Sequence, residues 1–181
     1  HQVQAQAKVL DKAILLDPDK DFLIPEFDIE IDIDLENSLS AFQDSGLTEI
    51  EGKDRVYLYG YGIHDRTLNK DWHSASIDSF ADYSNTEDGE YQLLLKMWNF
   101  LKDHVAQAEA VGKSIGIFHY SSHEKTWWRN FARNHEGKPG VPTLEEVDDF
   151  TGDYFEDLLD YSKQVALGTT GYGIKKLAPK A

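Results

Sequence analysis

Residues 27–36 alternate apolar and acidic side chains without interruption. A period of two is typical of a β-strand, so the acidic side chains are expected to share one face of it. Neighbours on one face stand roughly 7 Å apart, which makes this face a row of like charges. A divalent cation with oxygen ligands can offset their repulsion, and so can water on a solvated edge strand. The pattern therefore leaves a metal site and a solvated acidic face open.

A further acidic residue follows a second predicted strand. The short apolar run 115–120 predicts a buried parallel strand, and a helix is expected over 123–134. If this strand lies beside the acidic strand, Glu124 in the first helical turn faces the acidic strand's carboxyl end. Asp34, Glu36 and Glu124 could then hold one or two Mg²⁺ or Mn²⁺ ions. By itself, an acid at a helix N-terminus also complements the helix dipole.

Two Asp-x-Glu pairs on the acidic strand compete for the role of first ligands. They are Asp28–Glu30 and Asp34–Glu36. We prefer the second, because the polar stretch 37–54 follows directly and active sites in such sheets lie beyond strand carboxyl ends. Asp32 lies two residues upstream on the same face and could add to the metal site.

The rest of the chain predicts the elements that position these acids. The expected strands are 27–36, 55–63, 72–77 and 115–120; the expected helices are 2–16, 87–111, 123–134 and 144–150. Residues 154–158 could be a strand end or the start of a further helix that ends near 167. Thr86, Ser122 and Thr143 are expected helix caps, the last within a capping box. An antiparallel meander followed by a helix, a parallel strand and another helix is the skeleton of the ribonuclease H-like α/β fold. We expect residues 1–24 to be a linker and 25–181 a domain that is cut at its C-terminus.

The composition excludes several classes of protein. The chain of 181 residues has no cysteine, which rules out disulfides and cysteine-based zinc or thiol chemistry. Its formal net charge of −15 argues against a simple phosphate-binding protein, but not against a nuclease whose carboxylates hold cations. No segment is apolar for the length of a membrane span. We therefore expect a soluble, cytoplasmic protein.

Two further groups of residues could contact a ligand. His119 and His123 are four residues apart, and we favour structural or substrate-contacting roles for them over zinc binding. The only basic-aromatic cluster consists of Lys125, Trp127, Trp128, Arg129 and Arg133. Bases of a nucleic acid could stack there, with one tryptophan in the core and the other half-exposed.

Taken in order, these motifs resemble the ribonuclease H-like exonuclease domain that accompanies RecB-type nuclease domains in bacterial proteins. The resemblance rests on the Asp-x-Glu strand and on the segments 56–60, 118–124, 155–159 and 171–177, and it covers most of 26–178. It implies a DEDD-type 3′–5′ exonuclease that cleaves DNA or RNA with two divalent metal ions. A RecB-like nuclease domain would then be the neighbour in the full-length protein.

The resemblance also implies roles for particular residues. Glu124 stands where the family usually has Asp, Asp157 matches a family acid, and the last family carboxylate would lie beyond Ala181. The predicted catalytic residues are Asp34, Glu36, Glu124 and Asp157; the predicted metal ligands are Asp32, Asp34, Glu36 and Glu124; the predicted nucleic-acid contacts are His119, Tyr120, His123 and Lys176. The alternative is an inactive acidic scaffold or interaction domain of the same fold.

Overall fold

The computed structural model describes residues 2–10, 14–17, 19, 23–38, 54–69 and 75–166. The chain divides into two compact units, one of residues 26–156 and one of residues 1–25 with 157–181. The larger unit contains the acidic strand and the helices that pack on it. None of the helices in the described ranges is long and apolar enough to cross a membrane.

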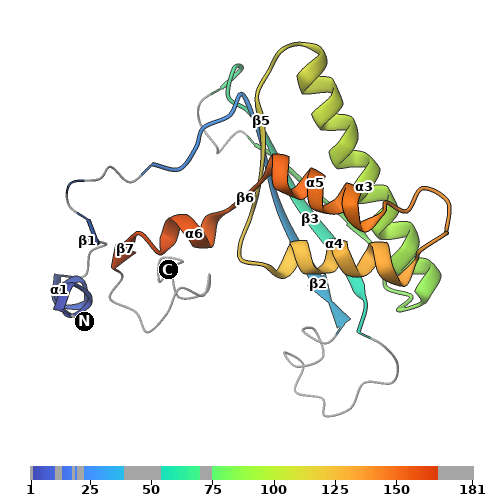
Figure 1. Cartoon of the computed structure of the whole chain (residues 1–181), viewed down its shortest axis with the longest axis horizontal. Coiled ribbons are helices and arrows are strands. Elements are labelled where there is room, and N and C mark those ends of the chain that lie inside the picture. Colours follow the sequence, from blue (N-terminus) through green and yellow to red (C-terminus); the bar gives the residue numbers. More distant parts are fainter. Residues whose placement is uncertain are drawn as a thin grey trace. The chain divides into compact units, whose positions relative to one another are not determined.

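The larger unit is built on a five-stranded mixed sheet (Figure 1). Its strands are β2 (Ile29–Asn37), β3 (Val56–Asp65), β4 (Ser76–Ala81), β5 (Ile115–His119) and β6 (Phe155–Asp157), in the spatial order β4-β3-β2-β5-β6. The acidic strand β2 lies at the centre, antiparallel to β3 and parallel to β5. The predicted meander and the predicted parallel neighbour of the acidic strand are both confirmed.

Three helices pack on the apolar face of this sheet. They are α3 (Glu87–Ala110), α4 (His123–Asn134) and α5 (Leu144–Tyr154). The core contains Ile31, Ile33 and Leu35, which are alternate residues of the acidic strand. It also contains Trp98 of α3 and Trp128 of α4. The period of two in β2 and the spacing of three and four in α3 bring these apolar faces together.

Capping residues mark the starts of two helices as predicted. The Thr86 side chain accepts a hydrogen bond from Gly89 N at 3.1 Å, and Thr143 forms a complete capping box with Glu146. Ser122 occupies the N-cap position of α4, but its side chain makes no capping hydrogen bond. The prediction that α5 ends near residue 150 is wrong: the helix continues to Tyr154, because its packing outweighs the roughly 1 kcal/mol that a helical glycine at 152 costs.

The third strand of the meander lies later in the chain than predicted. The expected strand was 72–77, whereas β4 is Ser76–Ala81 and pairs with β3 from Ile63↔Ser76 to Leu58↔Ala81. This register is decided by contacts with β3, which the local pattern of residue types does not contain. Residues 70–74 lie outside the described ranges.

The smaller unit corrects two predicted helices. It contains α1 (Gln2–Leu10), β1 (Ile14–Leu15), α6 (Leu158–Ser162) and β7 (Val165–Ala166). The helix expected over 2–16 is interrupted because β1 pairs antiparallel with β7, and the helix expected to reach 167 ends at Ser162 for the same reason. The two strands are about 150 residues apart in the chain, so a local pattern of residue types cannot predict that they pair. The helical turn expected near 39–42 and the segment 168–177 are not among the described residues.

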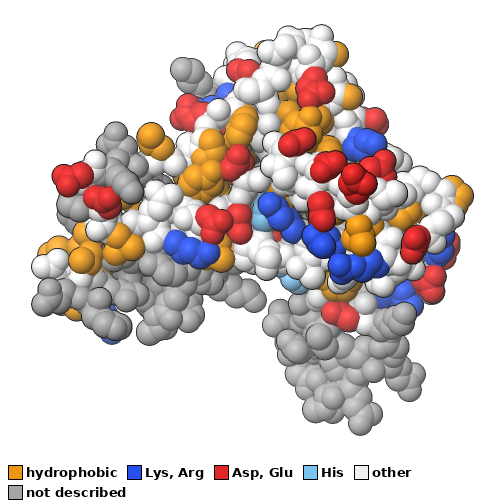
Figure 2. Space-filling model, in the orientation of Figure 1, with side chains coloured by type: hydrophobic (Ala, Val, Ile, Leu, Met, Phe, Trp, Pro, Cys, Tyr) orange, Lys and Arg blue, Asp and Glu red, His pale blue; other side chains and the backbone are white. Residues whose placement is uncertain are grey.

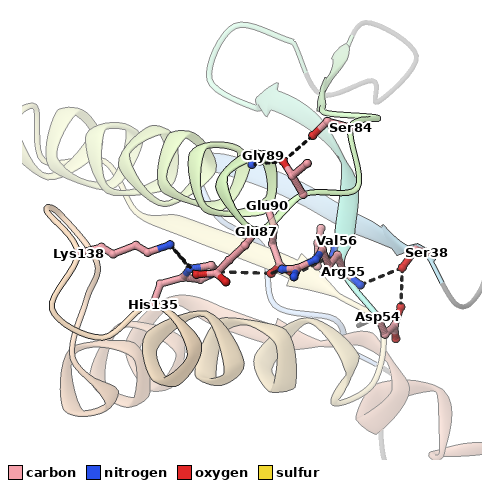
Figure 3. Close-up of polar contacts among 11 residues, drawn as sticks. Ser38, Asp54, Arg55, Val56, Ser84, Glu87, Gly89, Glu90, His135 and Lys138 are labelled. Atoms are coloured by element: carbon pink, nitrogen blue, oxygen red, sulfur yellow. Dashed lines mark hydrogen bonds and ion pairs between the residues drawn. The ribbon is translucent and has the colours of Figure 1, made fainter. Parts of the chain in front are cut away.

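A polar network joins the start of β3 to α3 and to the end of α4 (Figure 3). The buried Glu90 carboxylate accepts hydrogen bonds from Val56 N at 3.0 Å and Arg55 Nη1 at 3.3 Å. It also lies 3.3 Å from Nε2 of the buried His135, whose Nδ1 is 3.2 Å from Lys138 Nζ. Because an ammonium group can only donate, Nδ1 accepts and the Nε2 proton points at Glu90.

Candidate functional site

The carboxyl-terminal half of β2 presents two carboxylates at the surface. Asp32 and Asp34 are exposed, and in the register with β3 they lie directly opposite Gly62 and Gly60. A glycine partner places no side chain beside a carboxylate, so both groups stay accessible from the β3 side. Glu36, two residues further along, is half-buried.

The amino-terminal part of the same face is covered by aromatic side chains. In the register with β5, Glu30 and Asp32 pair with Gly116 and Phe118. A Cβ atom at Gly116 would lie 2.3 Å from the ring of Phe27, whose centroid is 5.9 Å from that of Phe118. Phe27 therefore covers the acidic face and does not share the apolar face that the alternation predicted for it. Its position precedes the first residue of β2, so the strand period does not extend to it.

The two acids of the alternative Asp-x-Glu pair have structural partners. Asp28 Oδ2 accepts hydrogen bonds from Ser114 N and Ser114 Oγ, both at 2.9 Å, and the bond from the backbone contributes most to lowering the pKa of Asp28. Glu30 is buried, 3.4 Å from Arg66 Nη1 and 3.6 Å from His64 Nδ1. These contacts tie β2 to its neighbours, which supports the choice of the later pair as the site.

Glu124 projects from the first turn of α4 and is 3% exposed. Its Oε2 atom lies 3.4 Å from Nδ1 of His119, the last residue of β5, and has no hydrogen-bond partner in the described part of the chain. The buried hydroxyl group of Tyr59 also has no hydrogen bond there. Burial and the nearby Glu124 charge raise the pKa of Tyr59 well above its ordinary value. The carboxylate of Glu124 is thus buried, with His119 in contact and with its charge acting on Tyr59.

The charge of Glu124 affects the pKa of an acid on the acidic strand. Burial, followed by the Glu124 charge, raises the pKa of Asp34, while a hydrogen bond from Leu35 N and the nearby His123 oppose this. Asp34 belongs to β2, and Glu124 lies in the first turn of α4, just after the parallel neighbour β5. The sequence predicted these two acids as ligands of one metal ion; the structure shows that the charge of Glu124 affects Asp34, and the metal site stays a prediction.

The turn that delivers Glu124 contains a strained residue. Ser121, between β5 and α4, has a φ of +70°, in the left-handed region that non-glycine residues rarely adopt. Such a conformation costs about 1–3 kcal/mol and is over-represented at functional sites. Ser121 lies at the bend where the chain leaves the end of β5 and enters α4, the helix that carries Glu124.

The remaining predicted site residues are not all gathered at this edge. Asp157 caps α6 by accepting a hydrogen bond from Leu159 N at 2.9 Å. His119 is buried, so a direct contact with a nucleic acid on the surface does not fit the structure, whereas His123 is exposed beside Asp34. Tyr120 is half-buried with its hydroxyl group inside the protein. Lys176 lies outside the described ranges.

The described residues do not form a complete metal centre. Within them, no group of three or more His, Cys, Asp or Glu side chains is arranged to hold a metal ion. The set closest to the prediction is Asp34 with Glu124, and Asp32 and Glu36 lie on the same strand two residues to either side of Asp34. Sequence reasoning missed Tyr59, which the Glu124 charge affects because α4 packs on β3 through Trp128; no local signal points to it.

A hollow of about 360 Å³ lies at the opposite end of α4. Its walls include Arg133, Val141, Pro142 and Leu144, and none of its lining residues belongs to the predicted catalytic set. This hollow is therefore not lined by the predicted metal ligands.

Comparison of the chain with protein-family models, with curated proteins and with solved structures found no match. The fold defines an α/β protein with a five-stranded mixed sheet flanked by helices.

Replacing Asp32 with asparagine is expected to stabilise the protein at neutral pH. Burial, with a smaller effect from Glu30, raises the pKa of Asp32 to about 6, from an ordinary value of 3.8. Between pH 4 and 6 the unfolded chain has lost this proton while the folded protein keeps it, so wild-type stability falls across that window as pH rises. Because Asp32 is exposed, solvent screening reduces the expected gain above pH 6 to about 1 kcal/mol.

Urea denaturation of both proteins at pH 3.5, 5 and 7 measures this effect. The difference in free energy of unfolding between Asp32→Asn and wild type should be near zero at pH 3.5 and largest at pH 7. A difference that does not change with pH would show that Asp32 is not the group that titrates.

Proposed function

We propose that the chain is a divalent-metal-dependent nuclease domain of the ribonuclease H-like fold, which hydrolyses phosphodiester bonds of DNA or RNA with Mg²⁺ or Mn²⁺. The strand order β4-β3-β2-β5-β6, with the central strand parallel only to β5, is compatible with that fold. A 3′–5′ exonuclease action and an adjacent RecB-like nuclease domain belong to the same proposal and follow from the motif resemblance.

The interaction between Asp34 and Glu124 carries the proposal. Asp34 of β2 and Glu124 of α4 carry like charges, and burial, followed by the Glu124 charge, raises the pKa of Asp34. Glu124 Oε2 has no hydrogen bond in the described ranges, although its residue is 3% exposed. Two nearby carboxylates are an environment that a divalent cation stabilises.

The donor set fits Mg²⁺ or Mn²⁺ without a third protein ligand among the described residues. Mg²⁺ keeps several waters and is commonly bound by one or two carboxylates together with substrate phosphates. Asp34 and Glu124 would hold the ion, and Asp32 and Glu36 would add charge beside it. When bound, such an ion lowers the pKa of a coordinated water and stabilises charge on the phosphate. The exposed His123 lies where it can contact the substrate.

An acidic scaffold or interaction domain is the second candidate, and one observation favours it. No cluster of three metal-binding side chains occurs in the described ranges. A domain that has lost catalysis would keep the sheet and its acidic face without a complete ligand set. The two functions differ in their response to a metal ion.

Titration with Mn²⁺ during thermal denaturation distinguishes the two candidates. At ten times the dissociation constant, binding stabilises the folded state by about 1.4 kcal/mol. For a protein of this size the midpoint should rise by about 3–6 °C. We expect this rise for wild type and its loss in Asp34→Asn, because that substitution removes one of the two charged ligands.

The matched control is Asp103→Asn, which removes an exposed acid from α3 that is far along the chain from both strands. It should keep the full Mn²⁺ response. Equal responses in all three proteins would indicate diffuse binding to a chain of net charge −15, and no response in wild type would favour the scaffold. Mn²⁺-dependent shortening of a 5′-labelled oligonucleotide provides a second measurement of the nuclease activity.

A further inference from the structure

Helix α4 carries a stripe of three cations, Lys125, Arg129 and Arg133. They follow one another at intervals of four residues, so they lie on one helical face with about 6 Å of rise between neighbours. Lys125 and Arg129 are partly exposed and Arg133 is exposed. Figure 2 shows blue side chains in a row over α4, beside a group of red ones over α5.

The cations of this stripe are only partly neutralised. Arg129 pairs with Asp148 of α5 at 2.6 Å, and both side chains remain almost half exposed. Neither Lys125 nor Arg133 has an acidic group within ion-pair distance in the described ranges. This leaves a row of positive charge on the α4 face, next to the acidic side chains of α5, on a chain with 18 basic and 33 acidic residues (Figure 2). It would attract an anionic partner to this one face although the whole molecule is acidic.

The tryptophans next to the stripe do not take part in binding. Trp127 is 9% exposed and Trp128 is fully buried, so the expected half-exposed tryptophan is not found. Trp128 instead packs against Tyr59, with ring centroids 5.5 Å apart. Without an exposed ring for bases to stack on, the stripe can recognise charge but not base identity.

The stripe begins beside the acidic site. Lys125 directly follows Glu124 in the first turn of α4, and Arg129 and Arg133 lead away from it along the helix. Their spacing is close to that of successive phosphates in an extended single strand. We propose that Lys125, Arg129 and Arg133 bind the phosphate backbone of a single nucleic-acid strand that leads to the Asp34–Glu124 site. This inference rests on the proposed nuclease function and names the form of its substrate.

Salt-dependent binding of a fluorescent oligothymidylate tests the stripe. Measurements are made in EDTA, so that the result does not depend on metal binding. Each phosphate neutralised on a single strand contributes about −0.7 to the slope of log affinity against log salt. Wild type should give a slope of about −2. The double variant Lys125→Gln/Arg133→Gln should give about −0.7 and bind at least about tenfold more weakly at low salt.

The control is Lys96→Gln/Lys102→Gln, which removes the same charge from exposed positions on α3. It should bind like wild type. The proposal is overturned if wild type does not bind, if the control loses as much affinity as the stripe variant, or if polyglutamate competes as well as the oligonucleotide. The last result would indicate a surface for acidic proteins.

The oligonucleotide measurement tests the stripe and the Mn²⁺ measurement tests the nuclease proposal, so either proposal can be overturned without the other. Binding through the stripe without a Mn²⁺ response would remove the nuclease assignment and leave a nucleic-acid-binding surface. A Mn²⁺ response that depends on Asp34, without binding of the oligonucleotide through the stripe, would overturn only the proposal that the stripe binds a nucleic-acid strand.

Discussion

Replacing Trp98 with alanine is expected to lower the free energy of unfolding by about 3–5 kcal/mol. Trp98 is 3% exposed and lies where three helices meet. Its ring centroid is 5.4 Å from that of Trp128 in α4 and 4.9 Å from that of Phe150 in α5. Truncation to alanine removes these aromatic contacts and leaves a cavity that the surrounding helices fill only in part.

This loss is large compared with the total stability of a typical domain, about 5–15 kcal/mol. Urea denaturation followed by circular dichroism measures it. Trp98→Phe keeps part of the aromatic contact and should lose less. Val111→Ala, at an exposed apolar residue after the end of α3, is the control and should stay within about 0.5 kcal/mol of wild type. A loss below about 1 kcal/mol for Trp98→Ala would contradict the packing described for the three helices.

Glu90→Ala is expected to destabilise the protein by about 3 kcal/mol, the second-largest effect. The carboxylate is 5% exposed and is the acceptor for Val56 N and Arg55 Nη1 (Figure 3). Removing it leaves a buried N–H group and a partly buried guanidinium without their acceptor. The Nε2 proton of His135 also loses its partner, which loosens the end of α4 from the start of α3.

Two variants show whether this effect comes from the network. Glu90→Gln keeps an acceptor oxygen and loses only the charge, so it should lose about half as much stability. Asp103→Ala removes an exposed acid from the same helix and should change stability by less than about 0.5 kcal/mol. If Glu90→Ala behaved like Asp103→Ala, the buried hydrogen bonds of Glu90 would contribute no net stability.

The elements with strong local patterns could be predicted from the sequence. The alternation in β2, the spacing of apolar residues in α3 and the capping box at Thr143 each depend on residues within one element, so a local pattern contains the information. The elements that were predicted wrongly depend on partners that are distant in the sequence. β1 is a strand because β7 pairs with it, and β4 takes its bounds from its register with β3.

The same division holds for the candidate site. The sequence alone determined which residue types are present, and it predicted Asp34 near the end of one strand and Glu124 just after another. It could not place the tyrosine of β3 beside Glu124, or the ring of Phe27 over Gly116. Both contacts join segments that are far apart in the chain, so a local pattern of residue types does not contain them.

Glu30 and Asp34 show most clearly what the tertiary structure decided. Both are acids at alternate positions of one strand, and the sequence pattern treats them as equivalent. Glu30 is buried because His64 lies opposite it and Arg66 reaches it, whereas Asp34 is exposed because Gly60 lies opposite. The sequence determined a row of negative charge, and the neighbouring strand decided which charges are neutralised by protein and which remain for a ligand, because a carboxylate is stabilised by whatever partner lies across from it.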